Sequence, residues 1–292
     1  MNAARQGERR VPELTKEIVS ALRCKLTIGG HDRMTQRRGV NVEAFELFLR
    51  GREHARTATR TGNIAARGLL ERAIAIDPNY AAAHAVMAMT HILDYANGYS
   101  SDPEQSLRTG LELAQRVVRM DDSEPAGHFA LGAAYMWTKD LDRSLAEAER
   151  SMALSPNYAD GMRMRAHIQI FAGDPAGGLK NLEAYMQRDP HYPGMTLQLV
   201  ADARFALGDY EGAIAAIEKR LAQNSQSETA YALLASCYGQ LGRPEECQKA
   251  WAQAMRINPD FSMERRRRVL PFRRPEDFER RVEGLRKGGV AV

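Results

Sequence analysis

Apolar residues recur along most of the chain at the spacing of one helical face, most clearly between Pro125 and Tyr158. The first half of this stretch places Leu131, Ala134 and Tyr135 at i, i+3 and i+4, and a second run of the same kind starts at Leu141. A short polar turn separates the two runs. The closing Ser-Pro-Asn-Tyr breaks the second, because proline lacks the N–H donor of a helix interior. The pattern predicts two amphipathic helices joined as a hairpin, which needs similar neighbours to bury its apolar side.

The same breaker follows each of six such hairpins, at intervals of 44, 34, 34, 35 and 34 residues. The breakers stand at Pro78, Asp122, Pro156, Pro190, Ser225 and Pro259. A period of 34 residues is typical of the tetratricopeptide repeat. The stretch from His128 to Tyr135 reads H-x2-L-G-x2-Y, where that repeat has W-x2-L-G-x2-Y. We therefore predict an all-α fold, a right-handed α-solenoid of about six tetratricopeptide-like helix hairpins with flanking N- and C-terminal helices.

Three regions follow from this reading: residues 1–40, 41–261 and 262–292. The first is expected to hold a basic helix at Pro12–Leu26 and a linker, and the second is the solenoid. The second hairpin is ten residues longer than the others, most simply around Asp94–Pro103. We expect a loop there, which either projects as a functional loop or is a long connection packed by its own tyrosines.

Residues 262–292 are expected to cap the last repeat. A short arginine-rich turn at Glu264–Arg268 precedes a helix that starts at Pro275 and runs through Leu285. Phe278, Val282 and Leu285 would then cover the final hairpin while the arginines face water.

Charge is distributed unevenly along a chain of otherwise ordinary composition. Residues 1–40 carry 9 Lys/Arg and 4 Asp/Glu, residues 262–292 carry 10 and 5, and the repeats between them are net acidic. Basic ends could contact phosphate or keep the ends of the solenoid soluble, and we rank nucleic acid low among the partners. No apolar run is long enough to cross a membrane and no secretory signal opens the chain, so a cytoplasmic protein is expected.

The residues offer no catalytic constellation, cofactor motif or metal site. His84 and His91 lie seven residues apart on one predicted helix, without a thiol or carboxylate to complete a metal set. Three cysteines are too few and too scattered for a disulfide framework or a zinc site. Cys237 and Cys247 fall at small-residue positions of the last hairpin, which indicates buried free thiols and a reducing compartment.

The first helix of each hairpin is expected to line the concave face, and helical phase selects the side chains that point into it. Aromatic rings beside two arginines and a histidine would suit a peptide with an acidic group or a carboxyl terminus. Packing of the rings between helices, with arginines that only solvate the groove, explains the same pattern equally well. The candidate partner-binding residues are Phe129, Met136, Trp137, Arg163, His167, Phe171, Arg204 and Phe205.

Several stretches together are more specific than the repeat, among them Asn41–Glu53, Leu69–Ala85, Asp94–Leu107 and Ile257–Gly289. Their arrangement resembles the C-terminal half of bacterial class III adenylate cyclases that carry tetratricopeptide repeats behind the catalytic domain. In that family the catalytic domain supplies two metal-binding aspartates and the residues that hold ATP. Nothing in Met1–Val11 can stand for them, so no catalytic residue carries over. The resemblance implies a truncated or separately encoded tail.

The sequence thus predicts a non-enzymatic scaffold, without a cofactor, that binds a protein or peptide partner in its concave groove. The alternative is a regulatory tail that acts with a class III adenylate cyclase or another signalling protein. Whether the chain associates with itself is left open.

Overall fold

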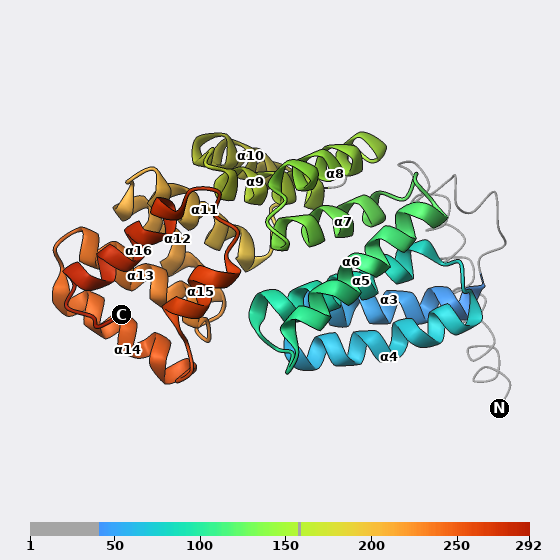
Figure 1. Ribbon diagram of the computed structural model, residues 1–292, viewed down its shortest axis with the longest axis horizontal. Coiled ribbons are helices and arrows are strands. Elements are labelled where there is room, and N and C mark those ends of the chain that lie inside the picture. Colours follow the sequence, from blue (N-terminus) through green and yellow to red (C-terminus); the bar gives the residue numbers. More distant parts are fainter. Residues whose placement is uncertain (1–40, 157–158) are drawn as a thin grey trace, which may run out of the picture.

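The computed structural model describes residues 41–156 and 159–292, and the predicted helix at Pro12–Leu26 lies outside them. Fourteen helices, α3 to α16, make up the described chain, which contains no β-strand. Helices α3 to α14 stack side by side into a curved row, with α7 to α10 at the top of the bend in Figure 1. The predicted all-α solenoid is confirmed.

Consecutive helices pair into six hairpins, as the breaker spacing predicts. The second helix of the first pair begins at Arg60, where the Thr59 side chain caps it. The pairs are α3 (Val42–Arg56) with α4 (Arg60–Ile76), α5 (Ala81–Asn97) with α6 (Pro103–Met120), α7 (Pro125–Trp137) with α8 (Leu141–Leu154), α9 (Ala159–Ala172) with α10 (Pro175–Arg188), α11 (Gly194–Ala206) with α12 (Tyr210–Gln223), and α13 (Glu228–Gln240) with α14 (Pro244–Ile257).

Equivalent aspartates start the second helix in three successive hairpins. The carboxylates of Asp140, Asp174 and Asp209 accept a hydrogen bond from the backbone N–H of the third residue of α8, α10 and α12, at 3.1, 2.9 and 2.9 Å. Such a cap satisfies one of the donors that the first turn of a helix leaves unpaired. The period of the repeat is therefore encoded at the turns as well as in the apolar faces.

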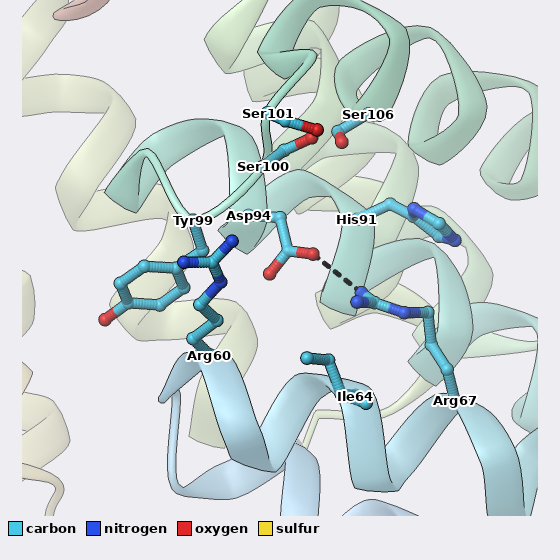
Figure 2. A pocket seen from close by; sticks show the side chains of 9 residues that line it. All are labelled: Arg60, Ile64, Arg67, His91, Asp94, Tyr99, Ser100, Ser101 and Ser106. Atoms are coloured by element: carbon cyan, nitrogen blue, oxygen red, sulfur yellow. Dashed lines mark hydrogen bonds and ion pairs between the residues drawn. The ribbon is translucent and has the colours of Figure 1, made fainter.

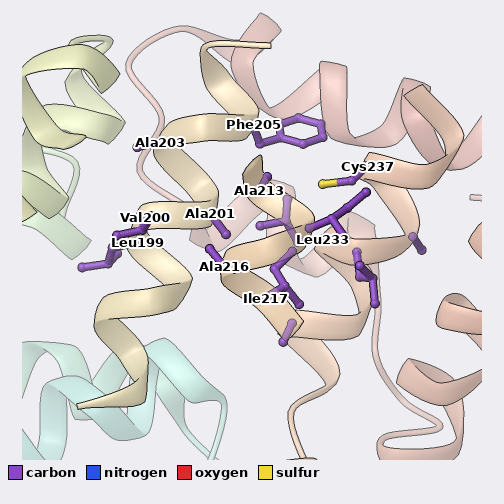
Figure 3. Packing of buried hydrophobic residues seen from close by; sticks show 14 of the residues in the cluster. Leu199, Val200, Ala201, Ala203, Phe205, Ala213, Ala216, Ile217, Leu233 and Cys237 are labelled. Carbon is purple, nitrogen blue, oxygen red and sulfur yellow. The ribbon is translucent and has the colours of Figure 1, made fainter. Parts of the chain in front are cut away.

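Small residues at the repeat positions bring neighbouring helices close together. Ala166, Ala201 and Ala235 are fully buried at equivalent places in α9, α11 and α13. Larger side chains fill the space between them, and Figure 3 shows Phe205 near Ala213 of α12 and Cys237 of α13, with Leu199 on the opposite side of α11. Each hairpin buries its apolar side against the next, which is how a repeat array builds a continuous core.

The ten extra residues of the second hairpin do not form a ten-residue loop, so that expectation was wrong. Asp94 to Asn97 belong to α5, and the connection to α6 is short. Ile92, Tyr95 and Ala96 are buried, so the apolar stripe of α5 continues through one further turn. The helix ends at Gly98, whose φ of 70° suits a residue without a side chain.

The last two helices do not simply extend the row. Residues 264–268 form part of α15 (Met263–Val269) instead of a turn, and Ser262 caps this helix. The predicted final helix is present as α16 (Pro275–Lys287), and it packs on α13. Residues 262–292, here the C-terminal segment, run back inside the bend, where α15 faces the side of α5 and α6 (Figure 1).

Candidate partner-binding face

The eight residues predicted for the groove lie on α7, α9 and α11, the first helices of three successive hairpins. Four of the five apolar members have aromatic rings, and all five are buried. Trp137, His167 and Phe171 form one ring cluster, with centroid separations of 6.4, 6.4 and 4.8 Å. Phe205 lies apart from this cluster and packs edge-on against Tyr210 at 5.2 Å.

Both predicted groove arginines are paired within their own hairpins. Arg163 donates to Asp160 at 3.1 Å, and Arg204 forms an ion pair with Asp209 at 2.9 Å. A carboxylate that approached either guanidinium would have to compete with a resident acid. The two side chains thus provide less attraction for an acidic partner than the sequence suggested.

The C-terminal segment covers these residues. Phe272 meets the ring of Phe171 at 4.8 Å and a right angle, the edge-to-face geometry that aromatic pairs favour. The backbone N–H of Arg273 donates to the Phe171 carbonyl at 2.9 Å. The Arg274 guanidinium donates to the carbonyl of Gly173 at 3.2 Å. The end of α9 therefore binds a length of chain about one hundred residues away in the sequence.

Helix α16 continues the contact onto α11. Arg280 donates to the Ala206 carbonyl at 2.7 Å, and Arg281 pairs with Asp202 at 3.0 Å. The Arg281–Asp202 pair is well shielded, since the two side chains are 12% and 13% exposed. The Arg281 guanidinium also lies 5.0 Å from the ring centre of Phe272 and 5.9 Å from that of Phe205. Cation–π attraction therefore adds to the ion pair.

Two titratable groups are strongly affected by this enclosure. Burial, with the nearby charges of Arg163 and Arg266, lowers the pKa of His167 to about 3. The imidazole is thus neutral at neutral pH. Burial, with the positive charge of Arg281, also lowers the pKa of Arg266 to about 10, so that this guanidinium keeps its proton at neutral pH.

Contact with the segment involves groups that the sequence analysis missed, chiefly Asp202 and the helix-end carbonyls of Phe171, Gly173 and Ala206. A backbone carbonyl carries no sequence signal. Asp202 does carry one, because it lies three residues before Phe205 and therefore on the same side of α11.

A separate pocket of about 300 Å³ opens between α4, α5 and the start of α6 (Figure 2). Hydroxyl groups of Ser100, Ser101 and Ser106 line one side, and the carboxylate of Asp94 forms part of the wall. Asp94 accepts hydrogen bonds from Arg67 at 2.8 Å and from Asn63 at 2.7 Å. This buried network ties α4 to α5, so the pocket wall is part of the packing between the first two hairpins.

Within residues 41–156 and 159–292, no three His, Cys, Asp or Glu side chains come close enough to hold a metal ion. Cys237 and Cys247 are free and fully buried, as predicted. No helix of the described chain is both long and apolar enough to span a lipid bilayer.

A family model described as a tetratricopeptide repeat matches residues 204–264, from the end of α11 to the start of α15. Among solved structures, the APC/C hetero-tetramer Cut9-Hcn1 aligns over 80% of this chain and 46% of its own, with a TM-score of 0.59 and 13% identity. Pseudomonas aeruginosa pilF aligns over 77% and 96%, with a TM-score of 0.52 and 15% identity. At these identities the similarity concerns the fold alone.

One curated relative, a putative adenylate cyclase 3 of Rhizobium meliloti (strain 1021), is 37% identical over 132 residues. The aligned region is 45% of this chain and 22% of the relative, so the match spans about a fifth of that protein's length. The repeat period, the six stacked hairpins and the family model matched at residues 204–264 lead to one conclusion: the chain has the fold of a tetratricopeptide-repeat solenoid, and part of it resembles a putative adenylate cyclase.

Proposed function

We propose that this chain is a protein-interaction scaffold without catalysis of its own, and that a protein or peptide partner binds to its concave face. The single observation that supports this most strongly is the contact between that face and the C-terminal segment. There, Phe171, Asp202 and the carbonyl ends of two helices already hold a length of polypeptide. A face with these groups has the features that bind helical peptides elsewhere, an aromatic anchor with charged contacts around it.

The cytoplasm stays the proposed compartment. Cys237 and Cys247 are buried as free thiols, which is consistent with a reducing environment.

Site-specific photo-cross-linking in cells tests the concave assignment. A benzophenone amino acid would replace Arg163 on α9 in one variant and Glu218, exposed on α12, in a matched control. We expect a cross-linked partner from position 163 and none from position 218. A partner captured only from position 218 would assign binding to the outer face, and no partner from either position would argue against a scaffold.

A regulatory role with a nucleotide cyclase is the second candidate, favoured by the 37% identity to the putative adenylate cyclase. Its test is the cAMP content of cells that express the Rhizobium meliloti relative with or without this chain. A change in cAMP supports the role, and an unchanged content removes it.

A further inference from the structure

We infer that the concave face of the last three repeats is a receptor for a basic helix preceded by a phenylalanine, and that the C-terminal segment is its built-in occupant. A partner helix of the same chemistry binds by replacing this segment. The inference rests on the proposed function and adds the chemical class of the partner, which is basic where the sequence had suggested acidic.

The receptor repeats the same acceptor along the solenoid. Phe171 and Ala206 occupy equivalent places at the ends of α9 and α11, one 35-residue repeat apart. Their carbonyls accept bonds from the segment, from the Arg273 backbone and from the Arg280 side chain. The last carbonyls of a helix have no partner within it and carry partial negative charge, so successive repeats present acceptors for the backbone N–H groups and cationic side chains of a bound segment.

Two fixed anchors set the register of the occupant. The Phe171 ring receives Phe272, and the shielded Asp202 carboxylate receives Arg281. These two segment residues also contact each other, because the Arg281 guanidinium lies over the Phe272 ring. An incoming segment therefore needs an aromatic ring just before its helix and an arginine within the helix that can meet in the same way.

The start of the segment is held more weakly than its end. Every residue of α15 keeps part of its surface exposed, and the ion pair of Arg273 with Asp142 lies in solvent. Exposed pairs contribute little stability. Phe278, Val282 and Leu285 of α16 are almost completely buried by contrast. Exchange is therefore expected to begin at α15.

A labelled peptide with the sequence of residues 262–287 tests the inference on the full chain. In the wild-type protein the tethered segment competes at an effective concentration on the order of millimolar, so the peptide binds weakly. The double variant Phe272→Ala with Arg281→Ala weakens the tethered copy, and we expect it to bind the peptide at least tenfold more tightly. The matched control is Arg286→Ala, which changes an exposed arginine of the same helix.

A third variant checks where the peptide binds. Adding Asp202→Asn to the double variant removes the acceptor for the peptide's own arginine, and the gain in affinity should be lost. Equal binding by the double variant and the wild type, with helical circular dichroism retained, would overturn the inference. A gain that Asp202→Asn leaves intact would also overturn it, since the peptide would then bind elsewhere.

Nicking the wild-type segment avoids any change to its contacts. A protease site inserted at Asp260, in the exposed turn before α15, allows cleavage of the folded chain. The labelled peptide should then enter the nicked protein and not the intact one, and failure to enter after complete cleavage would contradict exchange. A cellular partner cross-linked from position 163 without peptide exchange would support the scaffold and remove only this inference.

Discussion

His167 illustrates how the fold alters a single side chain. Its ring lies beside Trp137 and Phe171, and burial near Arg163 and Arg266 lowers its pKa to about 3. An unfolded histidine takes up its proton near pH 6.5, whereas the folded one stays neutral until about pH 3. Between these values the unfolded state binds more protons, so acidification destabilises the fold through this group.

We predict that His167→Gln reduces the loss of stability on lowering the pH from 6.5 to 4. One proton accounts for at most about 1.4 kcal/mol per pH unit in this window. Urea unfolding across the range measures the slope. His191→Gln changes an exposed histidine and should leave the slope unaltered. A His167→Gln slope equal to that of the wild type would mean that the ring is not shielded.

A second prediction concerns the buried carboxylate of the pocket wall. Asp94→Asn should lower the free energy of unfolding by about 1–3 kcal/mol, because Arg67 loses its charged acceptor in a partly buried place. The urea midpoint is the measurement. Asp260→Asn, at an exposed turn, is expected to stay within about 0.5 kcal/mol of the wild type. Equal effects of the two changes would refute the role of the network.

Among single residues, the sequence predicted the two buried thiols correctly, whereas for the aromatic rings it left two alternatives open, a partner-binding groove or packing between helices. It did not predict that Arg163 and Arg204 pair with Asp160 and Asp209. Those pairs depend on rotamers and helix ends, which apolar periodicity does not record.

The packing of two helices depends on how closely their backbones can approach each other. α13 and α16 cross at Gly239 and Gly284, and a Cβ added to Gly284 would lie 2.3 Å from the carbonyl oxygen of Ser236. Backbone atoms cannot move away as a flexible side chain can. The final helix is thus positioned by glycines on both partners.

Gly284→Ala should therefore destabilise the protein by about 1–3 kcal/mol, the usual cost of forcing extra volume into a packed contact. Gly68→Ala is the matched control, since Gly68 lies on the exposed side of α4 with open space around it. That change should stabilise the protein by up to about 1 kcal/mol through helix propensity. Urea unfolding shows whether each change lowers or raises the free energy of unfolding. A stabilising Gly284→Ala would exclude the close crossing of α13 and α16.

The sequence predicted a helix reliably where the segment has an apolar stripe, and less reliably where it has none. α15 was missed because MERRRRV has almost no apolar residues to mark a face. Its Ser262 cap and its arginines, which are good helix formers, were the available signals. The extra turn of α5 was missed because Asn97 and Gly98 are typical loop residues, so the sequence indicated that the loop begins before them.

In the whole molecule, the C-terminal segment adds contacts between distant repeats that a plain solenoid lacks. A plain repeat array has contacts only between neighbours, so it can unfold in parts. Here Phe272 packs on the ring of Phe171, and Arg274 donates to the carbonyl of Gly173 across 101 residues of sequence. Such long-range contacts couple the middle repeats to the last one.

Weakening the segment should therefore loosen the array as a whole. We predict that Phe272→Ala with Arg281→Ala gives a broader urea transition and a larger radius of gyration by small-angle scattering, whereas Arg286→Ala changes neither. An unaltered radius together with an equally sharp transition would show that the segment does not brace the repeats.

The sequence led us to expect the final helix on the last hairpin, and α16 does pack on α13. The contacts of the segment with α9 and α11 could not be predicted, because the hydrophobic pattern of α16 does not say which other helices it meets. The charge distribution gave a partial indication. A basic end and net acidic repeats attract each other, and the shielded Arg281–Asp202 pair is one outcome.

The glycine at position 288 has a practical consequence for chemical labelling. A Cβ placed there would lie 2.1 Å from the sulfur of Cys247, so the end of α16 covers this thiol directly. In a variant with Cys24→Ser and Cys237→Ala, Cys247 is the single thiol that a maleimide can modify. Burial raises its pKa and keeps the reagent out. The rate of alkylation would then measure how often the last helix lifts from its neighbours.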